Sequence, residues 1–243
     1  MMYLTRARLA QGPGQSGAIA AQLAEASGRD LGHALIWSLM SKDGPGRDFI
    51  YRQTDVSPPS YLILSQRKPE DAHRLWKLET KSFAPGLAIG ARFSFSLRVS
   101  PSIRKGRGAV PTEKGEPVAN KQVDVVMDAK LRAKREGRKF DYDEDVPLVA
   151  SDWLAARAER RGFSFQRQTL RVSGYRQIEL AAANKKDQSP SRRESGKHDK
   201  RFSVLDFDGV LTVTDPALFA KALTEGIGGK RSYGCGLLLI RPV

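Results

Sequence analysis

DFIYRQTDVSPPSYLILSQ, residues 48–66, contains two short runs of β-forming residues with a break between them. Aromatic and β-branched side chains are frequent in 48–54 and in 60–66, and the intervening Asp-Val-Ser-Pro-Pro contains strong turn formers. Two such runs close together are typical of a β-hairpin with a loop. The segment therefore predicts two paired strands, and the fold depends on what lies on either side of them.

Two elements are expected before the hairpin. The residues MYLTRARL, 2–9, alternate apolar and polar side chains at the period of a β-strand. In GRDLGHALIWSLM, 28–40, apolar residues recur at helical spacing from His33, and Asp30 can cap the helix N-terminus. A strand followed by a helix is the prediction.

Two more elements are expected after the hairpin. PEDAHRLWKLE, 69–79, has modest helical character, and ARFSFSLRVSP, 91–101, alternates strictly. The resulting order of strand, helix, two strands, helix and strand is the ferredoxin-like fold, which RNA-recognition modules share. We expect Phe93 and Phe95 in the core, because alternating aromatic residues usually face inward, and they are no evidence for base stacking.

The second half repeats this mixed α+β plan. PSIRKGRGAVPTEKGEPVANK, 101–121, is rich in Gly, Pro and cations and has no sustained periodicity, which is typical of a linker. We predict an N-terminal domain at 1–102, a basic linker at 103–120 and a C-terminal domain at 121–243. The C-terminal domain has predicted helices at 131–139, 145–162 and 216–226, and predicted strands within 163–183 (two, joined at 172–175), 202–215 and 234–243.

The charge of the chain points to an anionic partner. Its 243 residues include 41 Lys and Arg against 27 Asp and Glu, a net charge of +14. Such a surplus suits a phosphate-rich partner or an anionic membrane surface. No run approaches the roughly 20 apolar residues of a spanning helix, and no secretory signal is evident, so we expect a cytoplasmic protein. The single cysteine, Cys235, excludes an intramolecular disulfide.

VLDFDGVLTVTD, 204–215, matches the first motif of the haloacid-dehalogenase-like phosphatases. In that motif an apolar strand delivers two aspartates, here Asp206 and Asp208, to a Mg²⁺ site. The phosphatase fold needs further catalytic residues after this motif, and only 35 residues follow Asp208 in this chain. We therefore interpret the segment as a strand that ends in an Asp-Gly turn.

EGIGGKRSYGCGLLLIRPV, 225–243, is a glycine-rich basic loop followed by an apolar strand. Glycines let backbone N–H groups approach an anion, and Lys230 and Arg231 add charge, although the spacing fits neither a P-loop nor a dinucleotide fingerprint. Together with the strand at 2–9, a histidine on the first helix and DGVLTVTDP at 208–216, the loop makes the chain resemble the CasE-type CRISPR-associated endoribonucleases. The resemblance is nearly end to end, and the terminal motif is its most specific part.

This resemblance implies two tandem ferredoxin-like domains that bind the hairpin of a CRISPR repeat transcript, cut it once at its 3′ base and retain the product within a type I-E Cascade complex. It also implies a reaction without metal or cofactor, in which the 2′-OH of the RNA attacks and leaves a 2′,3′-cyclic phosphate and a 5′-OH. The expected partners are the repeat RNA, which matures into the guide RNA, and the other Cascade subunits. No membrane and no small-molecule substrate is expected.

The catalytic residue is expected to be His33, because the helix-borne histidine of the family falls there. Histidine is the natural proton carrier near neutral pH. Some relatives have a tyrosine three residues earlier, whereas this chain has Asp30. Ser27 or Lys42 could replace that second group, or His33 could act nearly alone.

RNA contacts are expected from several basic segments and from the glycine-rich loop, because structured RNA is bound mainly through its backbone and shape. The predicted contacts are Arg98, Arg104, Lys105 and Arg107, which are expected on a loop at the end of the fourth strand, Lys185 and Lys186 in a charged loop, and Gly228, Gly229, Lys230 and Arg231. A non-catalytic RNA-binding subunit and a general nucleic-acid-binding protein remain the alternatives.

Overall fold

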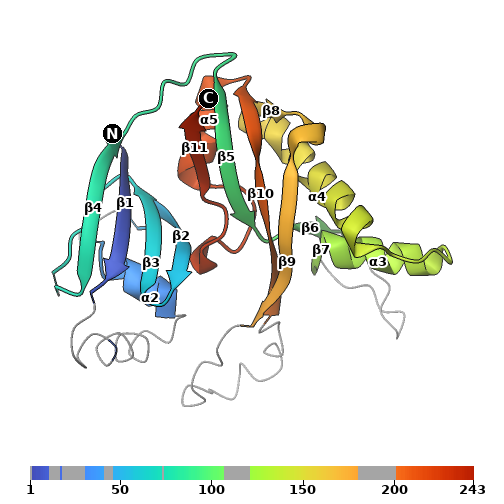
Figure 1. Cartoon of the computed structure of the whole chain (residues 1–243), viewed down its shortest axis with the longest axis horizontal. Coiled ribbons are helices and arrows are strands. Elements are labelled where there is room, and N and C mark those ends of the chain that lie inside the picture. Colours follow the sequence, from blue (N-terminus) through green and yellow to red (C-terminus); the bar gives the residue numbers. More distant parts are fainter. Residues whose placement is uncertain are drawn as a thin grey trace.

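The computed structural model describes residues 2–10, 17, 31–40, 46–72, 74–106, 121–179 and 201–243. Two antiparallel sheets lie next to each other, and helices α3 and α4 lie at the end of the molecule away from the first sheet (Figure 1). None of the helices in the described part of the chain is both long and apolar enough to cross a membrane.

The first sheet has the strand order β2-β3-β1-β4. Its elements are β1 (Met2–Leu9), α2 (Leu31–Trp37), β2 (Phe49–Val56), β3 (Pro59–Ser65) and β4 (Trp76–Phe83). The predicted hairpin is confirmed, with Ile50 opposite Leu64 and Tyr51 opposite Ile63. The predicted strand at 2–9 lies between β3 and β4, and α2 covers the face that buries Ala7 and Ile63. This is the strand order of a ferredoxin-like domain.

The helix predicted at 69–79 is wrong. The chain instead forms a turn and then the edge strand β4, which pairs with β1 along its whole length. Both carboxylate oxygens of Asp71 accept backbone N–H groups, from Leu75 at 3.0 Å and from Trp76 at 2.7 Å. The side chain thus closes the turn and directs the chain into the strand, which outweighs the weak helical tendency of the segment.

The second sheet has the order β11-β5-β10-β8, with β9 also paired to β10. Its strands are β5 (Arg92–Val99), β8 (Phe163–Phe165), β9 (Arg171–Glu179), β10 (Arg201–Val213) and β11 (Leu238–Pro242). Its helices are α3 (Val125–Arg135), α4 (Tyr142–Ala158) and α5 (Pro216–Glu225). The central strands β5 and β10 occupy the same positions in the order of the second sheet as β1 and β3 occupy in the first. The fold is therefore α+β, with two tandem ferredoxin-like domains, as predicted.

The boundary between the two sheets does not fall at residue 102. Strand β5, predicted as the last strand of the first domain, pairs with β10 and β11 of the second sheet. Its inward residues, Phe93 and Phe95 among them, are buried in the large core of the second sheet. The division lies between β4 and β5 because these residues pack against partners from the C-terminal half.

Two other segments differ from the prediction. The predicted linker begins within β6 (Ser102–Lys105), which pairs with β7 (Lys121–Asp124), and residues 107–120 between them lie outside the described residues. The expected strand junction at 172–175 lies inside β9, where Gly174 has a positive φ of 65° beside a register shift in the pairing with β10. Glycine here accommodates a β-bulge instead of a turn.

The Asp-Gly turn expected at Asp208 is also wrong, because β10 continues through Gly209 to Val213. A Cβ atom at Gly209 would lie 3.2 Å from the ring of Phe95 on the neighbouring strand. The glycine therefore allows close packing across the sheet, which is a second use of glycine within strands.

Candidate functional site

The glycine-rich loop joins α5 to β11 and occupies residues 226–237. Lys230 has a left-handed backbone with φ 57°, and Arg231–Tyr233 forms one turn of 3-10 helix. A Cβ atom at Gly228, where φ is 85°, would lie 3.1 Å from the ring of Trp153. Because of this positive φ and this close contact, only glycine fits at position 228. The loop therefore has a defined structure.

The loop rests against the first domain. One guanidinium N–H of Arg47 donates to the Ser232 hydroxyl at 2.9 Å, and another donates to the Arg231 carbonyl at 2.8 Å. The Tyr51 hydroxyl donates to the Ser232 carbonyl. Arg47 and Tyr51 thus join the start of β2 to the loop, although the two segments lie more than 180 residues apart in the sequence.

Positive charge gathers where the loop meets β2. Burial, and to a smaller extent the nearby Arg231, lower the pKa of Arg47. The two acids of this region, Asp48 and Glu225, do not neutralise these cations, because each is hydrogen bonded to another arginine. Arg67 donates to Asp48 and Arg161 donates to Glu225, and these bonds lower the pKa of each carboxyl. Cations that lie close together and are not paired with these acids favour binding of an anion.

A cavity of about 670 Å³ opens between the loop and the start of β2. Its polar and charged lining consists of Arg47, Asp48, Gln66, Thr224, Glu225, Lys230, Arg231, Ser232 and Tyr233, so three cations face two carboxylates, each of which is hydrogen bonded to a further arginine. Arg47, Lys230 and Arg231 form no ion pair with any acid among the described residues. The size and charge of the cavity suit one or two phosphate groups of a nucleic-acid backbone.

His33 lies on α2, which packs beside the Arg231–Tyr233 turn of the loop. Buried Ala34, Leu35 and Ile36 fix the helix on the first sheet, while His33 is half-buried at its edge. The indole N–H of Trp37, one helical turn on, donates to Nε2 of His33 at 2.8 Å. The structure therefore brings together the predicted catalytic histidine and the predicted phosphate loop.

The predicted RNA contacts separate into three groups. Gly228, Gly229, Lys230 and Arg231 lie in the loop. Arg98, Arg104 and Lys105 lie on strands β5 and β6, so their expected place on a loop is wrong. Arg107, Lys185 and Lys186 lie outside the described residues, as do Asp30, Ser27 and Lys42. Lys105 is ion-paired with Asp128.

Known proteins resemble this chain over nearly its whole length. Residues 2–242 match the family described as CRISPR associated protein. The chain belongs to this family. A curated relative, the CRISPR system Cascade subunit CasE of Escherichia coli strain K12, is 22% identical over 227 residues, which cover 91% of this chain and 96% of the relative. The resemblance to CasE-type proteins is thus confirmed.

Solved structures share the fold of this CRISPR-associated protein. Thermus thermophilus Cse3 bound to an RNA representing a pre-cleavage complex is 20% identical, with a TM-score of 0.63 and 99% of each chain covered. Escherichia coli K-12 Cas6e is 19% identical, with a TM-score of 0.58 and coverage of 99% of this chain and 100% of that one. These similarities extend over both domains.

Asp206 of this CRISPR-associated protein has a structural role. Its carboxylate accepts two hydrogen bonds from Arg98, at 2.8 and 3.0 Å, and lies 3.4 Å from Arg52 of the first domain. The side chains of Asp206 and Arg52 are only 15% and 14% exposed. Arginines thus occupy the oxygens that a phosphatase would need for attack, and they connect the two sheets.

Replacing Asp206 with asparagine is expected to destabilise the protein by about 2–4 kcal/mol, because Arg98 and Arg52 would lose the charge that compensates them in a largely buried site. Asp208→Asn is the matched control, since no ion pair to Asp208 is found among the described residues, and we expect a change within about 0.5 kcal/mol. Urea unfolding of both variants measures the difference. Equal stability of the two variants would contradict the assigned role.

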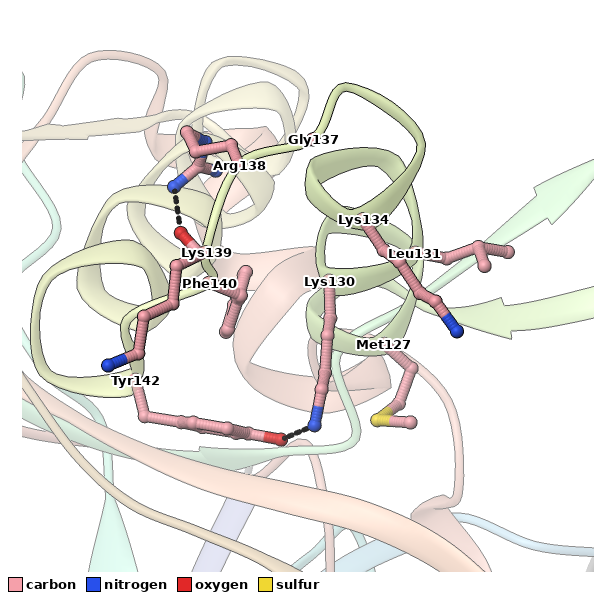
Figure 2. Close-up of a pocket in the computed structure, with 9 residues that line it drawn as sticks. All are labelled: Met127, Lys130, Leu131, Lys134, Gly137, Arg138, Lys139, Phe140 and Tyr142. Atoms are coloured by element: carbon pink, nitrogen blue, oxygen red, sulfur yellow. Dashed lines mark hydrogen bonds between the residues drawn. The ribbon is translucent and has the colours of Figure 1, made fainter.

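A second cavity, of about 630 Å³, lies between α3 and the segment that leads into α4 (Figure 2). Met127 and Leu131 are exposed on α3, at 42% and 46%, beside Lys130 and Lys134. The Lys130 ammonium donates to the Tyr142 hydroxyl and lies over the Tyr142 ring. The cavity is basic and partly apolar, but its lining shares no residue with the loop site.

Sequence reasoning missed Arg47 and Tyr51, which hold the loop. Arg47 follows a segment of turn-forming residues in the sequence and carries no pattern of its own, and Tyr51 reads only as a strand residue. Their importance comes from a contact between distant segments, which spacing along the chain does not reveal.

Proposed function

We propose that the chain is a CasE-type endoribonuclease that cleaves the hairpins of CRISPR repeat transcripts. Its relatives are named as a Cascade subunit and as an endoribonuclease bound to RNA, and the match extends over nearly the whole of each chain. The observation that carries the proposal is the position of His33 on a helix beside a basic loop whose cavity suits phosphates.

The reaction needs a group that moves protons and cations that stabilise the charge on phosphorus. His33 takes the proton of the 2′-OH, or supplies one to the departing 5′ oxygen. As the O2′–P bond forms and the P–O5′ bond breaks, Lys230, Arg231 and Arg47 stabilise the negative charge on the phosphoryl oxygens. The products are a 2′,3′-cyclic phosphate and a 5′-OH, and the mechanism requires no metal ion.

The rest of the hairpin is held by charge. Arg104 on β6 and the residues of the loop contact the RNA backbone, and after cleavage the guide RNA stays bound within a Cascade complex. Because each contact to a phosphate releases counterions, binding weakens steeply with rising salt. An enzyme that keeps its product turns over once, so a slow chemical step suffices.

The proposal is tested with a repeat hairpin RNA and a scrambled RNA of equal length, incubated with excess protein. We expect a single cut at the 3′ base of the hairpin, a cyclic phosphate on the upstream product, and no cut in the scrambled RNA. Equal affinity for both RNAs without cleavage would instead indicate a general nucleic-acid-binding protein. Selective binding without cleavage would indicate a non-catalytic RNA-binding subunit.

A further inference from the structure

The contact between Trp37 and His33 involves the atom of the histidine that chemistry would use. The indole N–H of Trp37 points at Nε2 of His33 across 2.8 Å, and the two rings meet edge to face at an interplanar angle of 80°. Trp37 is itself held by the ring of Phe49, which it meets at a centroid distance of 5.0 Å. The donor is therefore fixed in place.

The hydrogen bond from Trp37 determines which ring nitrogen of His33 carries a proton. A neutral imidazole has one N–H and one nitrogen lone pair, whereas the imidazolium has two N–H groups and no such lone pair. Because Nε2 accepts the indole N–H, its lone pair is occupied and the proton lies on Nδ1. The histidine can neither take a proton at Nε2 nor carry the charged form while this bond persists.

We propose that Trp37 holds His33 in a resting state in the free protein, and that bound RNA releases Nε2 before cleavage. This inference rests on the proposed function, because it presupposes that His33 transfers a proton. The bond then prevents His33 from acting until the substrate is in place. Trp37 is a positioning residue, since it acts only through His33.

A route from the RNA to this bond runs through Arg47. The Arg47 guanidinium lies over the Phe49 ring at 5.3 Å, on the same ring that Trp37 contacts, and also donates to the loop. A phosphate that enters the loop cavity attracts Arg47. Movement of Arg47 changes the packing of Phe49, and thereby the position of the Trp37 indole.

The first test uses nitrogen NMR on the labelled full chain, with a repeat hairpin that has a 2′-deoxy residue at the cut site. In the free protein we expect His33 with a protonated Nδ1 and an acceptor Nε2. Adding the RNA should abolish this pattern and shift the indole N–H signal of Trp37. The indole of Trp76, which is buried and has no hydrogen-bond partner among the described residues, serves as reference. An unchanged His33 pattern in the complex would overturn the proposal.

The second test is Trp37→Phe, which keeps a ring against Phe49 and removes the N–H. Binding of the 2′-deoxy hairpin is expected to tighten about twofold to tenfold, because RNA no longer has to break the bond. Trp76→Phe is the matched control, since the buried indole N–H of Trp76 has no hydrogen-bond partner among the described residues. We expect no change in RNA affinity for this control.

Weaker binding by Trp37→Phe, or a slower cut at saturating RNA, would show that the indole assists His33 and would overturn the proposal. If the variant fails to fold, the NMR test on the unaltered chain still decides. Failure of the proposed function is recognised separately: the unaltered chain would then not cleave the hairpin at all, or would cleave it independently of His33.

Discussion

Replacing His33 with alanine is expected to slow single-turnover cleavage of the repeat hairpin by about 10²–10⁴-fold, the usual contribution of a positioned proton-transfer group. Binding of the hairpin should not weaken, because the cations of the loop site stay in place, and it should tighten about twofold to tenfold, as for Trp37→Phe, because RNA no longer has to break the bond between Trp37 and His33. The rate is measured with excess protein on end-labelled RNA, and the affinity by titration of the 2′-deoxy hairpin.

Imidazole added to the buffer provides the control for this variant. A small base can occupy the space left by the missing side chain, so part of the lost rate should return with rising imidazole concentration. A His33→Ala variant that cleaves as fast as the unaltered chain would remove His33 from the reaction. The loop site would then have to act with a different proton carrier.

Replacing Gly226 with alanine is expected to disrupt the base of the loop. Gly226 has φ 76° and ψ 171°, a region that essentially only glycine occupies. An added Cβ would lie 2.1 Å from Cδ1 of Ile50 and 2.9 Å from the carbonyl oxygen of Gly236. Backbone strain and steric overlap together should cost about 3 kcal/mol and lower the Tm by roughly 6–12 °C.

Gly137→Ala separates the effect of backbone strain on stability from the effect of steric overlap. Gly137 also has a positive φ, of 71°, but a Cβ atom there would meet nothing within 4 Å. This variant should cost only about 1 kcal/mol, the strain of a left-handed alanine. Thermal unfolding compares the pair, and RNA binding should weaken for Gly226→Ala alone. Similar Tm values for both variants would show that the base of the loop tolerates a side chain.

Strands with strict alternation were predictable from the sequence, and their partners were not. The segment at 92–99 reads clearly as a strand because Phe93, Phe95, Leu97 and Val99 share one face, yet it pairs with β10 more than 100 residues later. Local alternation reports burial on one side, whereas the choice of sheet depends on contacts between distant segments. The boundary at residue 102 was wrong for this reason.

The candidate site was predictable in its chemistry but not in its assembly. Glycines beside Lys230 and Arg231 indicated a phosphate-binding loop, and the family resemblance selected His33 among three histidines. Neither observation showed that Arg47 and Tyr51 would hold the loop, or that Trp37 would occupy Nε2 of His33. These contacts are side-chain geometry that only the folded structure contains.

The measurement that tests the account most directly compares cleavage of two repeat hairpins in the presence of excess EDTA. One hairpin is entirely RNA, and the other has a single 2′-deoxy residue at the cut site. The account predicts that the first is cut at the same rate with and without EDTA, and that the second is bound but not cut. Loss of cleavage in EDTA, or cleavage of the 2′-deoxy hairpin, would contradict attack by the 2′-OH without a metal ion.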